Sequence, residues 1–142
     1  MGSDDQSRIR QARGVAALLE ARYDVQRHAA AKAREAVERL EQGLTVLARR
    51  ADGAAGSEFQ TSGAAMAWRL WVEQRREAIL RELANARAAE TQEKAKLGQA
   101  YSQMSAMQRI AEKQQSEQKS EAARKAAERM NEEIVAAAVC NQ

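Results

Sequence analysis

Apolar side chains follow one another at alternating intervals of three and four residues between residues 9 and 51. This spacing brings them to one face of an α-helix, and a strict seven-residue repeat is typical of a coiled coil. Because seven residues fall slightly short of two natural turns, the stripe keeps facing a partner only if the helices wrap left-handedly. The sequence therefore predicts a coiled-coil helix at residues 9–51, after a disordered segment at residues 1–8. Its predicted seam, the line of contact with another helix, consists of Ile9, Ala12, Ala16, Leu19, Tyr23, Gln26, Ala30, Ala33, Val37, Leu40, Leu44 and Leu47.

Two glycines mark the end of this helix. Gly53 and Gly56 supply the unusual backbone conformations with which helices often stop, so residues 52–57 are predicted to form a loop. Ser57 is followed three residues later by Gln60, which is the pattern of a capping box at the start of a helix. A second helix is therefore expected from residue 58. Because Gly63 follows closely, Thr61 or Ser62 is the alternative cap.

The second predicted helix covers residues 58–138, because the chain has no proline and is rich in strong helix formers. Residues 112–121 are almost entirely polar, which leaves open whether the helix bends there. Beyond them the apolar pattern resumes about two residues out of phase. The apolar positions before the polar stretch are Val72, Ile79, Leu83, Ala86, Leu97, Ala100, Met104, Met107 and Ala111, and those after it are Ala123, Ala127, Met130, Ile134 and Ala137.

The two predicted helices differ in length. At the usual rise per residue they measure about 65 Å and about 120 Å, so the second is about twice as long as the first. The expected fold is all-α, an antiparallel left-handed coiled-coil hairpin. A tight turn at residues 54 and 55 would place Tyr23 opposite Ala86 and Ile9 opposite Ala100. Residues beyond about 105 would then form an unpaired C-terminal extension.

This extension is the main functional feature of the pattern. Large apolar side chains left in water forgo about 1.5 to 3 kcal/mol each, so another surface is expected to cover them. One alternative is that the extension frays. Another is a structural, dimerising scaffold in which two extensions pair into a four-helix core. Weak self-association of the chain is also open. The side chains concerned are Met104, Met107, Ile110, Met130 and Ile134.

The concentrated aromatic site lies at residues 68–72. Trp68 and Trp71 are three residues apart and therefore share a helix face, which Arg75 continues one turn later. Exposed tryptophan and arginine are typical of binding hot spots, which favours a site for a protein partner. The tryptophans could instead cap the seam against Leu40 and Leu44.

Composition argues against several other functions. The 23 basic and 20 acidic residues are interspersed, with a net charge of +3, and aromatic residues make up 4% of the chain, which does not favour nucleic-acid binding. Residues 1–15 are too polar for a signal peptide, and no apolar run is long enough to span a bilayer. The single cysteine, Cys140, fits a reducing compartment, so a cytoplasmic protein is expected.

Catalysis is not expected either. The single histidine, His28, lies in an alanine-rich helix beside Arg27, with no nucleophile positioned near it in the sequence. One histidine and one distant cysteine offer no metal-ligand spacing, and the glycines form no phosphate-binding loop. The sequence therefore predicts a protein without enzymatic activity, cofactor or metal.

Taken as a whole, the layout resembles that of FliJ, a protein of the bacterial flagellar export apparatus, and of its YscO-type relatives in injectisomes. The likeness is closest over residues 68–80, beginning Trp68-Arg69-Leu70-Trp71, and over the charged segment 124–134. The resemblance implies a cytoplasmic stalk, peripheral to the inner-membrane export apparatus, that activates a hexameric export ATPase. It also implies contact with the cytoplasmic domain of an export gate protein and with export chaperones, or a chaperone role of its own. It does not distinguish flagellum from injectisome.

The resemblance also assigns residues to the two partners. The gate-facing residues would be Trp68, Trp71, Arg75 and Ala78. The shaft that enters the ATPase would be formed by Ile9, Ala16, Leu19, Met104, Met107, Ile110, Met130 and Ile134.

Overall fold

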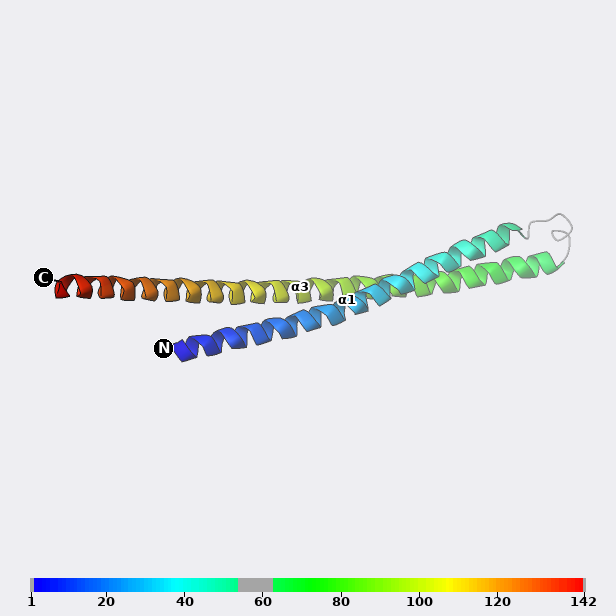
Figure 1. The fold of residues 1–142 in the computed structure, drawn as a ribbon. Helices are drawn as coiled ribbons and strands as arrows, with labels where there is room; N and C mark the ends of the chain where they lie inside the picture. The colour runs from blue at the N-terminus through cyan, green and yellow to red at the C-terminus, as the bar shows by residue number, and fades with distance from the viewer. Residues whose placement is uncertain (1, 54–62, 142) are drawn as a thin grey trace. The chain divides into compact units, whose positions relative to one another are not determined.

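The protein consists of two long helices. The computed structural model describes residues 2–53 and 63–141, and within them α1 comprises Gly2–Gly53 and α3 comprises Gly63–Cys140 (Figure 1). The polar stretch 112–121 is helical like its surroundings, so α3 is a single uninterrupted helix. The absence of proline and the abundance of alanine, glutamate, glutamine and arginine account for helices of this length.

The helix ends differ from the sequence prediction. α1 begins at Gly2, whereas residues 1–8 were predicted to be disordered; Asp4 and Asp5 lie in its first turn, where negative charge favours the helix dipole. At its other end α1 includes Asp52 and Gly53, the first two residues of the predicted loop. The remainder of that loop, the capping pair Ser57 and Gln60, and the predicted helix start at residue 58 lie outside the described residues.

The helices pack against each other as an antiparallel hairpin. Residues later in α1 contact residues earlier in α3, which is the antiparallel arrangement. Three cross-helix contacts within residues 24–99 demonstrate this order. These contacts join Gln26 to Glu93, Arg34 to Glu90 and Glu41 to Arg87.

The burial pattern confirms the predicted seam of α1. All twelve positions assigned from the seven-residue repeat are buried or half-buried. In α3 the nine apolar positions predicted up to residue 111 are also buried or half-buried. The same spacing of three and four continues through Glu90, Glu93, Gln114 and Gln118, which are buried or half-buried although they are polar.

The chain divides into two compact units with different cores. The unit Asp24–Gln99 buries large aliphatic side chains, including Val37, Leu47, Ile79 and Leu83. In the unit formed by Met1–Tyr23 and Ala100–Gln142, the buried hydrophobic residues among those described are two alanines, Ala12 and Ala100. Hydrophobic stabilisation scales with buried apolar area. The seam of the unit Asp24–Gln99 is therefore the more stable of the two.

The predicted pairing between the helices is wrong in detail. Tyr23 packs against Tyr101, with ring centroids 5.8 Å apart, and not against Ala86. Ile9 lines a cleft with Gln114 and Gln118 rather than facing Ala100. The prediction assumed a tight turn at residues 54 and 55, whereas α3 begins at Gly63, so each residue of α1 meets a later residue of α3.

The unpaired part of α3 is consequently shorter than predicted. Side chains are continuously exposed from residue 119 to residue 141, not from about residue 105. α3 contains 78 residues and α1 contains 52, a ratio of 1.5, so the predicted twofold ratio is not confirmed.

Candidate protein-binding surfaces

The C-terminal end of α3 presents apolar side chains that are not covered by α1. Within the unit that contains both termini, α3 extends beyond the first residues of α1 (Figure 1). Met130 and Ile134 are 63% and 60% exposed. We refer to the apolar row that contains them as the C-terminal stripe, consisting of Ala123, Ala127, Met130, Ile134 and Ala137, all of which are exposed.

The predicted shaft residues do not form one free surface. Met104 and Met107 are half-buried, and Met107 lines a cleft together with Arg8, Ala12 and Val15 of α1. The expectation that these two methionines lack a partner within the chain is therefore wrong, because each residue of α1 meets a later residue of α3 than predicted. Ile110 is exposed, as are Met130 and Ile134.

The shaft residues of α1 lie in the seam. Ile9, Ala16 and Leu19 are half-buried. A partner could reach most of their surface only if this part of α1 moved away from α3.

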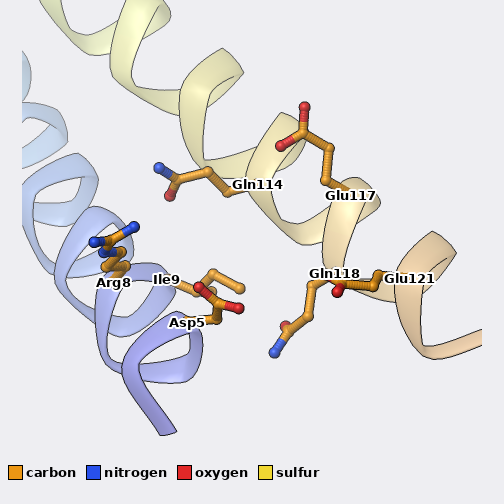
Figure 2. Close-up of a pocket in the computed structure, with 7 residues that line it drawn as sticks. All are labelled: Asp5, Arg8, Ile9, Gln114, Glu117, Gln118 and Glu121. Atoms are coloured by element: carbon orange, nitrogen blue, oxygen red, sulfur yellow. The ribbon is translucent and has the colours of Figure 1, made fainter. Parts of the chain in front are cut away.

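The seam ends in a polar cleft of about 220 Å³ (Figure 2). Asp5 and Ile9 point from α1 toward α3, and Gln118 points back toward them. The Gln114 side-chain oxygen is buried and has no hydrogen-bond partner among the described residues. Ile9 thus meets glutamines where a strong coiled coil would have aliphatic side chains.

Two of the three carboxylates around this cleft have basic partners on α3. Glu117 lies 3.9 Å from Lys113, and Glu121 lies 3.4 Å from Lys125. Within residues 2–53 and 63–141 there is no group of three or more histidine, cysteine or acidic side chains that could hold a metal ion. The cleft is best interpreted as a weakly packed end of the seam.

The tryptophan site is divided between a covered and an exposed ring. Trp68 and Trp71 stack with centroids 5.1 Å apart and planes 18° from parallel. Trp68 is half-buried, and its indole N–H is buried without an acceptor among the described residues. Trp71 is 47% exposed.

The other two predicted gate-facing residues are also divided. Arg75 is exposed, one turn after Trp71 on the same helix face, and Ala78 is half-buried. Met66 and Leu70, which the sequence analysis did not single out, are exposed large apolar residues in the same part of α3. Trp71 and Arg75 are therefore the members of the predicted set that are most accessible to a partner.

A groove that the sequence analysis missed lies between the helices within residues 24–99. Its lining is mixed, with Asp52, Glu73 and Arg76 beside apolar side chains. Leu44, Leu47 and Ala48 of α1 line it together with Val72 and Leu80 of α3. The sequence signal for this groove was Leu80, an exposed large apolar residue that lies off the predicted seam.

The middle of the seam is polar and hydrogen-bonded. Glu90 is 7% exposed, and its carboxylate lies 2.9 Å from the Lys94 ammonium and 3.4 Å from the Arg34 guanidinium. The hydrogen bond donated by Lys94 is the main cause that lowers the pKa of Glu90 below its ordinary value, with Arg34 contributing and burial opposing. These ion pairs compensate the burial of the Glu90 carboxylate within the seam.

Two further observations concern other functions. His28 and Cys140 are both exposed. None of the helices, over the residues described, is apolar enough for long enough to cross a membrane.

Comparison of the chain with models of known protein families, with curated proteins and with solved structures gives no match.

Proposed function

We propose that this chain is a non-enzymatic coiled-coil stalk of a bacterial type III protein export apparatus. In this proposal the exposed end of α3 enters the pore of a hexameric export ATPase and activates it. The observation that carries the proposal is the exposure of every residue from 119 to 141, including Met130 and Ile134. Large apolar side chains that the chain leaves in water favour burial against another protein.

A stalk needs no catalytic residue to change an enzyme's rate. A single shaft inside a sixfold ring contacts the six subunits unequally, and so stabilises some subunit conformations over others. Favouring one conformation at each interface would raise the rate of ATP hydrolysis.

A second region, in the unit Asp24–Gln99, would contact the export gate. The exposed ring of Trp71 and the guanidinium of Arg75 share a helix face and combine apolar area with charge, which is typical of residues that dominate binding energy. Two contact regions at different points along one hairpin would allow it to link the ATPase to the gate.

The proposal is tested by adding the purified chain to its cognate export ATPase. Hexamer formation, followed by sedimentation velocity, and ATP hydrolysis should both increase. Ile134→Asp should abolish the increase, because it places a charge in the C-terminal stripe. Val135→Asp is the matched control: Val135 is 62% exposed but lies about 100° around the helix, so this variant should still activate.

No change in hexamer formation or hydrolysis with the wild-type chain would refute the stalk. If the chain formed a stable dimer and left hexamer formation and hydrolysis unchanged, it would be a structural scaffold without a role in export.

A further inference from the structure

The C-terminal stripe lies on a different face of α3 from the seam. The last seam positions that α1 covers are Ala111, Gln114 and Gln118. Continuing their spacing of three and four residues leads first to four charged side chains, Glu121, Lys125, Glu128 and Glu132, and only then to Val135 and Val139.

The stripe is offset from that continuation by two residues. Two residues correspond to a rotation of about 200° around an α-helix. A longer α1 would therefore still not cover Met130 and Ile134. The occupant of the stripe must approach α3 from the far side.

The charges along this segment reverse sign at its middle. Residues 119–126 contain three basic side chains and one acidic side chain, whereas residues 127–134 contain three acidic side chains and one basic side chain. Two such segments laid side by side in parallel would place like charges together. In the antiparallel orientation the basic half of each lies beside the acidic half of the other, which is the favourable arrangement.

The sizes of the side chains in the C-terminal stripe also favour the antiparallel orientation. If the two-fold axis lies between residues 128 and 129, Ala127 of one copy faces Met130 of the other, and Ala123 faces Ile134. Each large side chain then meets a small one, as close packing requires. A parallel pair in register would instead set Met130 against Met130 and alanine against alanine.

We propose that the C-terminal stripe binds a second copy of this chain, with the two α3 ends antiparallel. The pairing is independent of the export proposal, because it is argued only from the stripe and its charges. It would also compete with any other protein that binds Met130 and Ile134, so the dimer would have to dissociate before the stripe could enter a larger assembly.

The native cysteine provides a direct test of orientation. Cys140 is exposed and is the only cysteine in the chain, so a nitroxide spin label can be attached there without any substitution. In the proposed dimer, Cys140 of one copy stands opposite Glu117 of the other, which separates the two labels by 23 residues (140 minus 117), or about 35 Å. A parallel dimer would bring them within about 10 Å.

The experiment combines sedimentation equilibrium of the full chain with pulsed electron resonance of the labelled chain. A dimer with labels about 35 Å apart is expected. A chain that stays monomeric at high micromolar concentration would overturn the proposal, and so would a dimer with the short separation.

Two variants locate the interface. Met130→Glu should weaken the dimer at least about tenfold, because it would bury an unpaired charge. Val135→Glu should leave the dimer unchanged, because Val135 is similarly exposed but lies off the stripe. Circular dichroism should show equal helix content in both variants, and equal weakening by both would contradict the assignment.

Discussion

The side-chain amide of Gln26 in α1 donates hydrogen bonds to both the main-chain carbonyl oxygen and the carboxylate of Glu93 in α3, the former at 3.3 Å. Near it, Arg34 reaches across to Glu90, which is otherwise covered by the seam. A shift of either helix by one turn would separate these partners. Polar groups at seam positions fix the register of coiled coils, and this layer is positioned to do so within residues 24–99.

The polar layer makes stability depend on pH in the acid range. Hydrogen bonds donated by Gln26 and, secondarily, by Lys96 lower the pKa of Glu93, and Lys94 lowers that of Glu90. A carboxyl whose pKa is lower in the folded state contributes stability that is present above its unfolded-state pKa, near 4.5, and lost as the pH falls through the folded-state value. The free energy of unfolding should therefore decrease as the pH falls below about 5.

Urea denaturation followed by circular dichroism at a series of pH values measures this dependence. The double variant Glu90→Gln, Glu93→Gln should show a flatter acid slope than the wild type. Leu83→Ala, which lowers stability without removing a carboxylate, should retain the wild-type slope. A double variant with an unaltered slope would show that other groups cause the acid sensitivity.

The seam of residues 24–99 should carry much of the stability. Leu83 is 4% exposed, so Leu83→Ala is expected to lower the free energy of unfolding by about 2 to 4 kcal/mol. Leu80, three residues earlier, is 44% exposed, and Leu80→Ala should cost less than about 1 kcal/mol. Thermal and urea denaturation of both variants compare the two costs, and similar losses would mean that the assigned seam is wrong.

The sequence predicted the seam of α1 well because its repeat is regular and mostly apolar. Val37 and Leu47 are buried where the seven-residue spacing placed them. The predicted seam of α3 was incomplete, because the prediction assigned only apolar residues to it. Glu90 and Glu93 fill the gap between Ala86 and Leu97 at the same spacing, and that spacing was the available signal.

The pairing of the two helices was harder to predict from the sequence. A repeat fixes which face of each helix is buried, but it fits equally well after a shift of seven residues. Tyr23 packs against Tyr101 and not against Ala86, because α3 begins at Gly63 and not directly after a tight turn at residues 54 and 55. The burial of Met104 and Met107 follows from the same shift in pairing, since Met107 lines its cleft with Ala12 and Val15, which lie inside the helix predicted at residues 9–51.

The proposed gate contact can be tested without the ATPase. Trp71→Ala and Arg75→Ala should each weaken binding to the cytoplasmic domain of the cognate export gate protein by about 2 kcal/mol, as is typical of hot-spot residues. Because Arg75 is exposed, Arg75→Ala should change helix content and thermal stability little. Trp71→Ala also loses the stack on Trp68, so both variants are compared at a temperature where circular dichroism shows full helix content. Isothermal calorimetry gives the affinity, and Met66→Ala serves as a control on the same part of α3, since Met66 is exposed but was not assigned to the contact. Unchanged affinity in both variants would remove these residues from the gate site.

The polar end of the seam should be improvable by a single apolar substitution. The buried side-chain oxygen of Gln114 has no hydrogen-bond partner among the described residues, and an unsatisfied buried polar group is costly. Gln114→Leu removes that cost and gives α1 an apolar contact, so it should stabilise the pairing of residues 2–16 with α3 by about 1 kcal/mol.

Amide hydrogen exchange detects this change locally, because exchange in a weakly held segment reports its own opening rather than global unfolding. Exchange of residues 2–16 should slow several-fold in Gln114→Leu, while exchange around Val37 should change little. Gln103→Leu is the matched control, since Gln103 lies on the exposed face of α3 and its replacement adds no seam contact. Equal slowing in both variants would indicate a general effect of leucine on helix stability. The packing of residues 2–16 against α3 would then not be limited by Gln114.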